Sequence, residues 1–105
     1  MVFIESSIFR KYLPNYLNEE EFRALQLFLA DSPEAGPVIK GSGGLRKVRW
    51  SAHGKGKSGG VRIIYYWQVT EDQIYLLTLY AKNEFSDLTP DQVAALRKLV
   101  EAWNP

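Results

Sequence analysis

Two long apolar segments in the second half of the chain have the alternating pattern of β-strands. Residues 61–69, V-R-I-I-Y-Y-W-Q-V, carry apolar side chains on both alternating faces, which is typical of a central strand covered on both sides. Residues 73–82, Q-I-Y-L-L-T-L-Y-A-K, are equally apolar, and the Glu71-Asp72 turn between the two segments predicts an antiparallel pair. Residues 45–50 also alternate, so we expect a third strand whose charges lie on its more exposed face.

The N-terminal segment combines a short strand pattern with a short helix pattern. Residues 2–4 are β-prone, and we expect them to form an edge strand or to pair with another strand. Residues 8–13 predict a short helix with Ser6 or Ser7 as its N-cap. Because proline lacks a backbone N–H and clashes with the preceding turn, we expect this helix to end at Pro14.

Two further helices begin with capping signals. Asn18 with Glu21 three residues later forms a capping-box pattern, and apolar side chains then recur at helical spacing up to the Asp31-Ser-Pro sequence. The last helix begins with T-P-D-Q from Thr89, in which threonine is the N-cap, proline takes the first helical position and glutamine completes the box. Its apolar stripe can pack on the sheet or on a partner.

The order of elements is strand, two helices, three antiparallel strands and helix. It predicts an α+β fold, in which a small, twisted antiparallel sheet, mixed through its N-terminal strand, is flanked by two N-terminal helices and one C-terminal helix. With 105 residues, the chain is expected to form one domain over residues 1–105.

Composition excludes several classes of site. The chain has no cysteine and one histidine, so disulfides, thiolate metal sites and histidine-cluster metal sites are excluded. No run of 18 apolar residues is present, and the N-terminus lacks the basic region of a signal peptide. A cytoplasmic protein without cofactor or metal is the simplest interpretation.

Positive charge is concentrated in one segment of a nearly neutral chain. The formal net charge is +1, yet residues 40–62 hold seven Lys or Arg, one His and no acidic residue. A cationic segment next to an apolar sheet is suited to a polyanion, and we infer RNA. The alternative is that these charges only solvate a hairpin. The basic side chains expected to converge on one face are Lys47, Arg49, Lys55, Lys57 and Arg62, and the aromatic side chains expected to stack on bases are Trp50, Tyr66 and Tyr80.

The glycine-rich part of this segment does not fit a P-loop. The Gly56-Lys57-Ser58 sequence has the right ending, but Ser51 occupies the position of the first glycine. The segment also leads into a strand, whereas a P-loop opens a helix. The sequence therefore disfavours nucleotide hydrolysis by a P-loop.

Arg62 is the most informative single residue, because it lies in an otherwise apolar strand. A buried arginine needs an anionic partner, which is either a substrate phosphate or an acid of the protein such as Glu84. Glu84 and Asp87 can position a lysine or cap the last helix, and capping is the preferred interpretation for Asp87. A lone histidine in a loop is more often incidental, so His53 is a minor candidate for a general base.

Three segments together resemble a known family. They are G-S-G-G-L-R-K-V-R-W from Gly41, G-K-G-K-S-G-G-V-R-I-I-Y-Y-W from Gly54, and L-L-T-L-Y-A-K-N-E-F-S-D-L-T from Leu76. With the order of elements, they make the chain similar to RelE/ParE-superfamily toxins of type II toxin–antitoxin systems, most closely the HigB-like branch. The resemblance covers nearly the whole chain and implies a RelE-like fold.

The resemblance implies an mRNA endonuclease (an mRNA interferase) that works in the ribosomal A site without a metal. Lys47 and Arg49 stand where the family has two basic residues before the hairpin, and Arg62 stands where it has the arginine that stabilises the phosphate. Nearby cations are expected to lower the pKa of a lysine that transfers a proton. Two positions depart from RelE, because Asn83 replaces a catalytic arginine and Thr89 replaces a late tyrosine. The expected catalytic residues are Lys47, Arg49, Lys57, Arg62 and Lys82, with Lys55 as a further proton-transfer candidate; the expected RNA-binding residues are Arg46, His53, Lys55, Tyr80, Asn83 and Glu84.

The same resemblance implies partners and two alternative functions. The partners are the 70S ribosome with its mRNA and a cognate antitoxin, expected to be a HigA-like protein with a helix-turn-helix. One alternative is a ParE-like gyrase poison, which the dense basic cluster disfavours. The other is an RNA- or ribosome-binding module that does not cleave, which the departures at Asn83 and Thr89 leave open.

Overall fold

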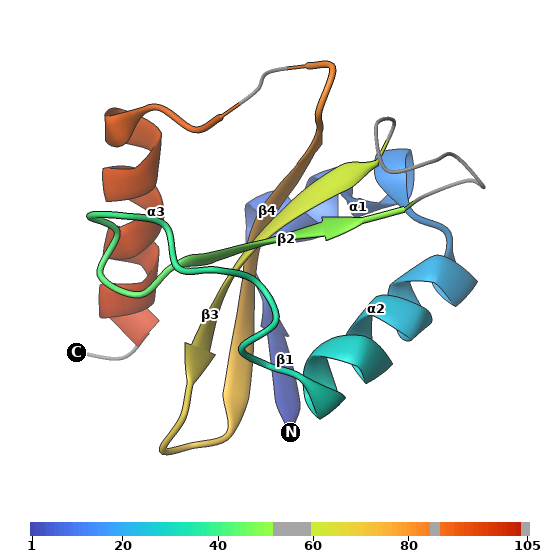
Figure 1. Cartoon of the computed structure of the whole chain (residues 1–105), viewed down its shortest axis with the longest axis horizontal. Coiled ribbons are helices and arrows are strands. Elements are labelled where there is room, and N and C mark those ends of the chain that lie inside the picture. The colour runs from blue at the N-terminus through green and yellow to red at the C-terminus, as the bar shows by residue number, and fades with distance from the viewer. Residues whose placement is uncertain (52–59, 85–86, 104–105) are drawn as a thin grey trace.

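The computed structural model describes residues 1–51, 60–84 and 87–103 (Figure 1). Their elements follow the predicted order of strand, two helices, three strands and helix. No helix among these residues is long and apolar enough to span a membrane. The elements are β1 (Val2–Glu5), α1 (Ser7–Tyr16), α2 (Glu19–Asp31), β2 (Arg46–Trp50), β3 (Val61–Gln68), β4 (Gln73–Ala81) and α3 (Pro90–Trp103).

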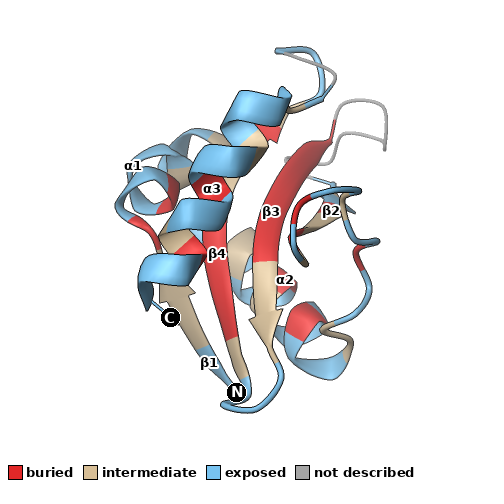
Figure 2. Cartoon of the chain, turned by 90° about the vertical axis from the view of Figure 1, so that its left-hand side faces the viewer, coloured by how far each residue is buried: buried red, intermediate tan, exposed pale blue. Residues whose placement is uncertain are grey.

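The four strands form one mixed sheet in the order β1-β4-β3-β2. β1 is an edge strand parallel to β4, while β2, β3 and β4 pair antiparallel. The helices α1 and α2 lie on one face of the sheet and α3 lies on the other (Figures 1 and 2). The predicted α+β fold is confirmed.

The sheet has a hydrophobic cluster on each face, so β3 is covered on both sides as predicted. Val61, Ile63 and Tyr65 belong to the cluster under α1 and α2. Ile64 belongs to the cluster under α3, which also contains Leu96 of that helix. The first five residues of β3, from Val61 to Tyr65, are buried (Figure 2).

A β-bulge in β4 changes which side chains face α3. Ile64 pairs with Thr78 but Tyr65 pairs with Leu76, so Leu77 is an extra residue in the ladder. Strict alternation from Leu76 would place Tyr80 under α1 and α2. Instead Tyr80 lies on the α3 face, and the sequence pattern alone did not predict this shift.

Helix boundaries follow the predicted caps, with one correction at Pro14. Asn18 and Glu21 exchange side chain–backbone hydrogen bonds at the start of α2, and Thr89 and Gln92 do the same before α3. The helix α1, however, does not end at Pro14 but runs on to Tyr16. Proline removes only one helical hydrogen bond, and the last turn is closed by the N–H of Leu17, which donates to the carbonyl of Leu13 at 3.0 Å.

Candidate functional site

Three basic side chains lie on the α3 face at one end of the sheet. Arg49 of β2 is directly opposite Arg62 of β3, and Lys47 is opposite Ile64. Ile64 packs in the α3-side cluster, and alternate strand residues share a face, so Lys47, Arg49 and Arg62 belong to the same face. We call these three residues the basic site. The predicted loop residues His53, Lys55 and Lys57 lie outside the described residues.

Arg62 is buried at the centre of the basic site. Its exposed fraction is 4%, and its Nη1 atom is buried without a hydrogen-bond partner among the described residues. The predicted alternative partner, Glu84, is engaged elsewhere, because it accepts hydrogen bonds from Tyr16 and from the N–H of Ala81. A buried guanidinium with an unsatisfied donor is suited to receive an anion.

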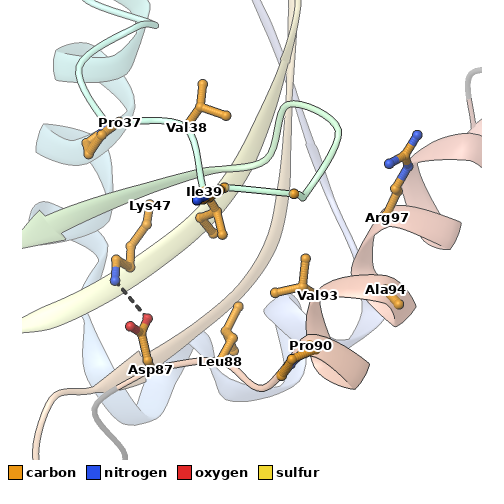
Figure 3. A pocket seen from close by; sticks show the side chains of 12 residues that line it. Pro37, Val38, Ile39, Lys47, Asp87, Leu88, Pro90, Val93, Ala94 and Arg97 are labelled. Atoms are coloured by element: carbon orange, nitrogen blue, oxygen red, sulfur yellow. Dashed lines mark hydrogen bonds and ion pairs between the residues drawn. The ribbon is translucent and has the colours of Figure 1, made fainter.

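Asp87 pairs with Lys47 and does not cap α3. The Nζ atom of Lys47 donates to Oδ1 of Asp87 at 2.9 Å (Figure 3). This hydrogen bond and the charge of Lys47 lower the pKa of Asp87, and the charge of Arg62 lowers it further. The preferred interpretation of Asp87 as a helix cap was therefore wrong, because Thr89 performs that role. The sequence argument named the positioning of a lysine as the other role for Asp87, and the pair with Lys47 agrees with that alternative.

A groove extends from the Lys47–Asp87 pair between the segment 37–41 and α3 (Figure 3). Its volume is about 730 Å³, which is in the range of small-molecule sites. Most of its lining is apolar, with a few charged side chains at its edges. The lining residues are Pro37, Val38, Ile39, Lys40, Gly41, Lys47, Asp87, Leu88, Pro90, Val93, Ala94 and Arg97.

A tight turn after β4 presents Lys82 and Asn83. The N–H of Glu84 donates to the carbonyl of Ala81 at 3.0 Å, and the Glu84 carboxylate accepts from the N–H of Ala81 at 2.8 Å. The Tyr16 hydroxyl donates to that carboxylate and lowers its pKa. Burial, followed by this hydrogen bond and the charge of Glu84, raises the pKa of Tyr16 to about 12. Lys82 and Asn83 are exposed and are held at the edge of the basic site by this turn.

Some predicted RNA contacts are not on the exposed part of this face. Tyr80 is opposite Arg62 but is 2% exposed, so its ring has no free face on which a base could stack. Burial raises its pKa, and the charge of Asp87 adds to the effect. Arg46 lies on the other face, where its Nη1 donates to the carbonyls of Glu34 and Gly36 at 3.1 and 2.8 Å. The burial of Tyr80 argues against base stacking by its ring, and the carbonyl contacts of Arg46 argue against an RNA contact from that side chain.

The other two aromatic candidates are partly covered by neighbouring rings. Trp50 is half-buried, with its ring centroid 5.3 Å from that of Phe28. Tyr66 is half-buried and stacks on Tyr75 at 6.1 Å. Each retains only part of its ring surface for a ligand.

Sequence reasoning missed the role of Tyr16 and preferred the wrong one of its two roles for Asp87. No local signal connects Tyr16 to Glu84, which is 68 positions away. For Asp87 a signal was present, because the complete capping box of Thr89 and Gln92 left no capping role for Asp87. Within the described ranges no group of three or more His, Asp or Glu side chains could hold a metal ion.

Comparisons with known proteins place this site in a family. The family model described as RelE toxin of the RelE/RelB toxin–antitoxin system matches residues 33–104. The fold is similar to that of a double arginine-to-alanine variant of the E. coli toxin RelE in the free state, with a TM-score of 0.60, 12% sequence identity, and coverage of 94% of this chain and 95% of that chain. The family match includes all of the basic site. The chain therefore belongs to the RelE toxin family, the toxins of RelE/RelB toxin–antitoxin systems.

Proposed function

We propose that this toxin is a ribosome-dependent mRNA endonuclease that stops translation by cutting mRNA. The observation that carries the proposal is the buried Arg62, with a guanidinium nitrogen that has no hydrogen-bond partner among the described residues. A charge held in this way is unfavourable without an anion. The RNA phosphate supplies that anion, and Lys47 and Arg49 on the same face add sequence-independent attraction to the backbone.

The chemistry needs only groups of the chain and of the RNA. The 2′-hydroxyl attacks the adjacent phosphorus and loses its proton to a base, while the bond from phosphorus to the 5′-oxygen breaks and an acid protonates that oxygen. The products are a 2′,3′-cyclic phosphate and a 5′-hydroxyl. Arg62 and Arg49 stabilise the negative charge that grows on the phosphate oxygens, since donors fixed in advance require no reorganisation in the transition state.

Proton transfer is proposed for the lysines around Arg62. Lys47 already donates a hydrogen bond to Asp87, so in this arrangement it is set up as a donor, which suits the acid for the leaving oxygen. Lys82 is presented by the turn after β4, and Lys57, outside the described residues, completes the catalytic set. Arg49 and Arg62 are poor bases, because arginine remains protonated.

The remaining RNA contacts and the partners complete the proposal. Lys55, His53, Asn83 and Glu84 are proposed to border the path of the RNA, Glu84 through the turn that it holds. The toxin is proposed to belong to the HigB-like branch, to act in the cytoplasm on the 70S ribosome without a metal, and to be neutralised by a HigA-like antitoxin with a helix-turn-helix.

In vitro translation with the purified protein tests this function. The mRNA is analysed by primer extension, and the 3′ ends are tested for a cyclic phosphate. We expect the wild type to cut in the A site and Arg62→Ala to cut at least about a hundredfold more slowly. Arg23→Ala removes the same charge from an exposed position of α2, on the other face of the sheet, and should cut normally.

Three results would contradict the proposal. If the wild type blocks translation without cutting, the protein is a binding module. If translation is unaffected but gyrase-dependent DNA breaks appear, it is a gyrase poison. If Arg62→Ala and Arg23→Ala cut equally well, the chemistry does not depend on the basic site.

A further inference from the structure

An acid lies beside the cations of the basic site. The Nζ atom of Lys47 donates to Oδ1 of Asp87 at 2.9 Å, and the two side chains point toward each other from β2 and from the segment before α3 (Figure 3). Within the described ranges, this is the ion pair that includes a residue of the basic site. Because like charges repel, a carboxylate beside Lys47 weakens the binding of a phosphate there.

Stability does not account for this acid either. The side chain of Asp87 is 74% exposed and that of Lys47 is 28% exposed, and ion pairs with an exposed partner contribute little to folding. The cap of α3 is supplied by Thr89, so the helix does not need a second cap. Neither RNA affinity nor the fold explains why Asp87 lies here, which leaves a role in the chemistry.

The neighbours of Asp87 keep its carboxylate ionised at neutral pH. The hydrogen bond and the charge of Lys47 lower its pKa, and the N–H of Leu88 and the charge of Arg62 add to this effect. Tyr80 of β4 also faces it, since burial raises the pKa of Tyr80 and the charge of Asp87 raises it further. Asp87 is thus ready to accept a proton, whereas an ordinary lysine must first lose one and an arginine stays protonated. A carboxylate has about four lone-pair positions, so the contact with Lys47 leaves room for a substrate hydroxyl.

We propose that Asp87 is the general base for the 2′-hydroxyl and that Asp87 and Lys47 work together as a proton relay. The inference rests on the proposed endonuclease function and assigns the base that this function needs. The 2′-oxygen bonds to phosphorus while its proton passes to the Asp87 carboxylate. The bond from phosphorus to the 5′-oxygen breaks, and that oxygen takes a proton from the Lys47 ammonium. The proton on Asp87 then crosses the 2.9 Å hydrogen bond to the Lys47 amine, which restores both groups without net uptake of a proton.

Replacing Asp87 with asparagine keeps an acceptor for Lys47 but removes the base. Single-turnover cleavage is measured with saturating toxin on ribosome-bound mRNA, at the position where the wild type cuts. We expect Asp87→Asn to cut about a hundredfold or more slowly, the usual effect of losing a general base, and Asp87→Glu to recover much of the rate. Asp91→Asn is the matched control and should cut as the wild type, because Asp91 is an exposed acid in the first turn of α3.

A sulfur leaving group separates the base from the acid. In a second mRNA, sulfur replaces the 5′-oxygen of the scissile linkage, and because a thiol has a pKa of about 8.5, it leaves without a proton. We expect Lys47→Met, slow on the normal mRNA, to come within about tenfold of the wild type on the sulfur mRNA. Asp87→Asn should stay slow on both.

The pH dependence of the wild type on the sulfur mRNA identifies the base independently. The rate should be constant from about pH 5.5 to about pH 8.5, because Asp87 is ionised throughout this range. A histidine base would make the rate fall below about pH 6.5, and a lysine base would make it rise across the whole range. Either of these profiles would exclude Asp87 as the base.

The outcomes separate the relay from the function. If the wild type cuts and Asp87→Asn cuts as fast as Asp91→Asn or faster, Asp87 is not the base and the endonuclease stands. If the sulfur mRNA restores Asp87→Asn as fully as Lys47→Met, Asp87 acts only by holding the acid, and the relay is wrong. If the wild type cuts neither mRNA, the endonuclease and the relay both fail. Thermal unfolding checks the fold of each variant, and the pH profile, which needs only the wild type, decides even if a variant does not fold.

Discussion

Tyr16 of α1 donates a hydrogen bond to Glu84, in the turn that follows β4, and so connects the first helix to the edge of the basic site. The same Glu84 oxygen accepts the backbone N–H of Ala81. The carboxylate therefore joins the helix to both ends of the turn that presents Lys82 and Asn83. This relationship makes a tyrosine outside the basic site a positioning residue for it.

Replacing Tyr16 with phenylalanine should loosen this turn. We expect Tyr16→Phe to lower the free energy of unfolding by about 1 kcal/mol, the usual contribution of a hydrogen bond, measured by urea denaturation. Cleavage should slow, and Glu84→Gln, which keeps an acceptor, should slow it less. Tyr12→Phe is the control, because Tyr12 lies exposed on the same helix. Equal stability of the two tyrosine variants would show that the hydrogen bond contributes nothing.

The raised pKa of Tyr16 predicts where this stabilisation disappears. Its pKa in the folded protein is about 12, above the ordinary 10.0, so folding favours the neutral phenol. A raised folded-state pKa gives stability that is complete below pH 10 and is lost as the pH rises toward 12. The difference in unfolding free energy between wild type and Tyr16→Phe should be constant from pH 8 to 10 and then shrink. A difference that grows above pH 10 would contradict this assignment.

Ser6 is a second junction, at the start of α1. Its hydroxyl accepts the N–H of Phe9 at 2.9 Å and donates to the carbonyl of Leu77 at 2.7 Å. Leu77 is the bulge residue of β4, and Ser6 is 2% exposed. Ser6→Ala removes a helix cap and leaves a buried carbonyl unsatisfied, so we expect a loss of about 2 kcal/mol in unfolding free energy. Ser7→Ala, one residue along and exposed, should change it by less than about 0.5 kcal/mol.

Much of the fold could be predicted from local patterns. Both capping boxes gave correct helix starts, and the two-sided apolar pattern of residues 61–69 correctly indicated a central strand, which the structure has as β3. The end of α1 was predicted too early, because the prediction counted only the hydrogen bond that Pro14 removes. It did not include the packing of Leu13 and Tyr16 against the core under α1 and α2. Local rules fail where tertiary contacts compensate for a local cost.

The site was predictable only in part. The burial of Arg62 followed from its place in an apolar strand. The position of Tyr80 depends on a β-bulge in β4, and no glycine, proline or other turn residue in that strand indicates the bulge. The Lys47–Asp87 pair joins residues 40 positions apart, so it depends on how β2 and the segment before α3 meet. The face on which a side chain lies, and its distance from side chains of other elements, are set only when the sheet assembles.

Breaking the Lys47–Asp87 pair should have a small, pH-dependent effect on stability. The Asp87 side chain is 74% exposed, so Asp87→Asn should cost less than about 1 kcal/mol. Its pKa in the fold is below the ordinary 3.8, so the contribution is present above pH 3.8 and is lost as the pH falls through the lowered pKa. Urea denaturation at pH 7 and at pH 2 to 4 measures this.

The exposed Glu71 offers a control for that experiment. Glu71→Gln removes the same charge from the turn between β3 and β4. It should leave the free energy of unfolding within about 0.5 kcal/mol of the wild type. High salt should reduce the effect of Asp87→Asn, because exposed charges are screened. A difference that persists at pH 2, or that 1 M salt leaves unchanged, would show that charge is not its cause.

We expect the buried charge of Arg62 to make the folded protein less stable than a variant with an uncharged side chain at this position. A buried guanidinium with an unsatisfied nitrogen loses hydration without full compensation, and Arg49, also cationic, is directly opposite on β2. Methionine fills a similar volume without the charge. We therefore expect Arg62→Met to raise the free energy of unfolding by about 1–2 kcal/mol while abolishing cleavage.

The exposed Arg49 tests whether burial matters, since Arg49→Met should change stability by less than about 0.5 kcal/mol. A protein that became both more stable and inactive would show that Arg62 is kept for its ligand at the expense of the fold. If Arg62→Met were destabilising, the arginine would instead serve the structure, and its buried charge would no longer argue for a phosphate.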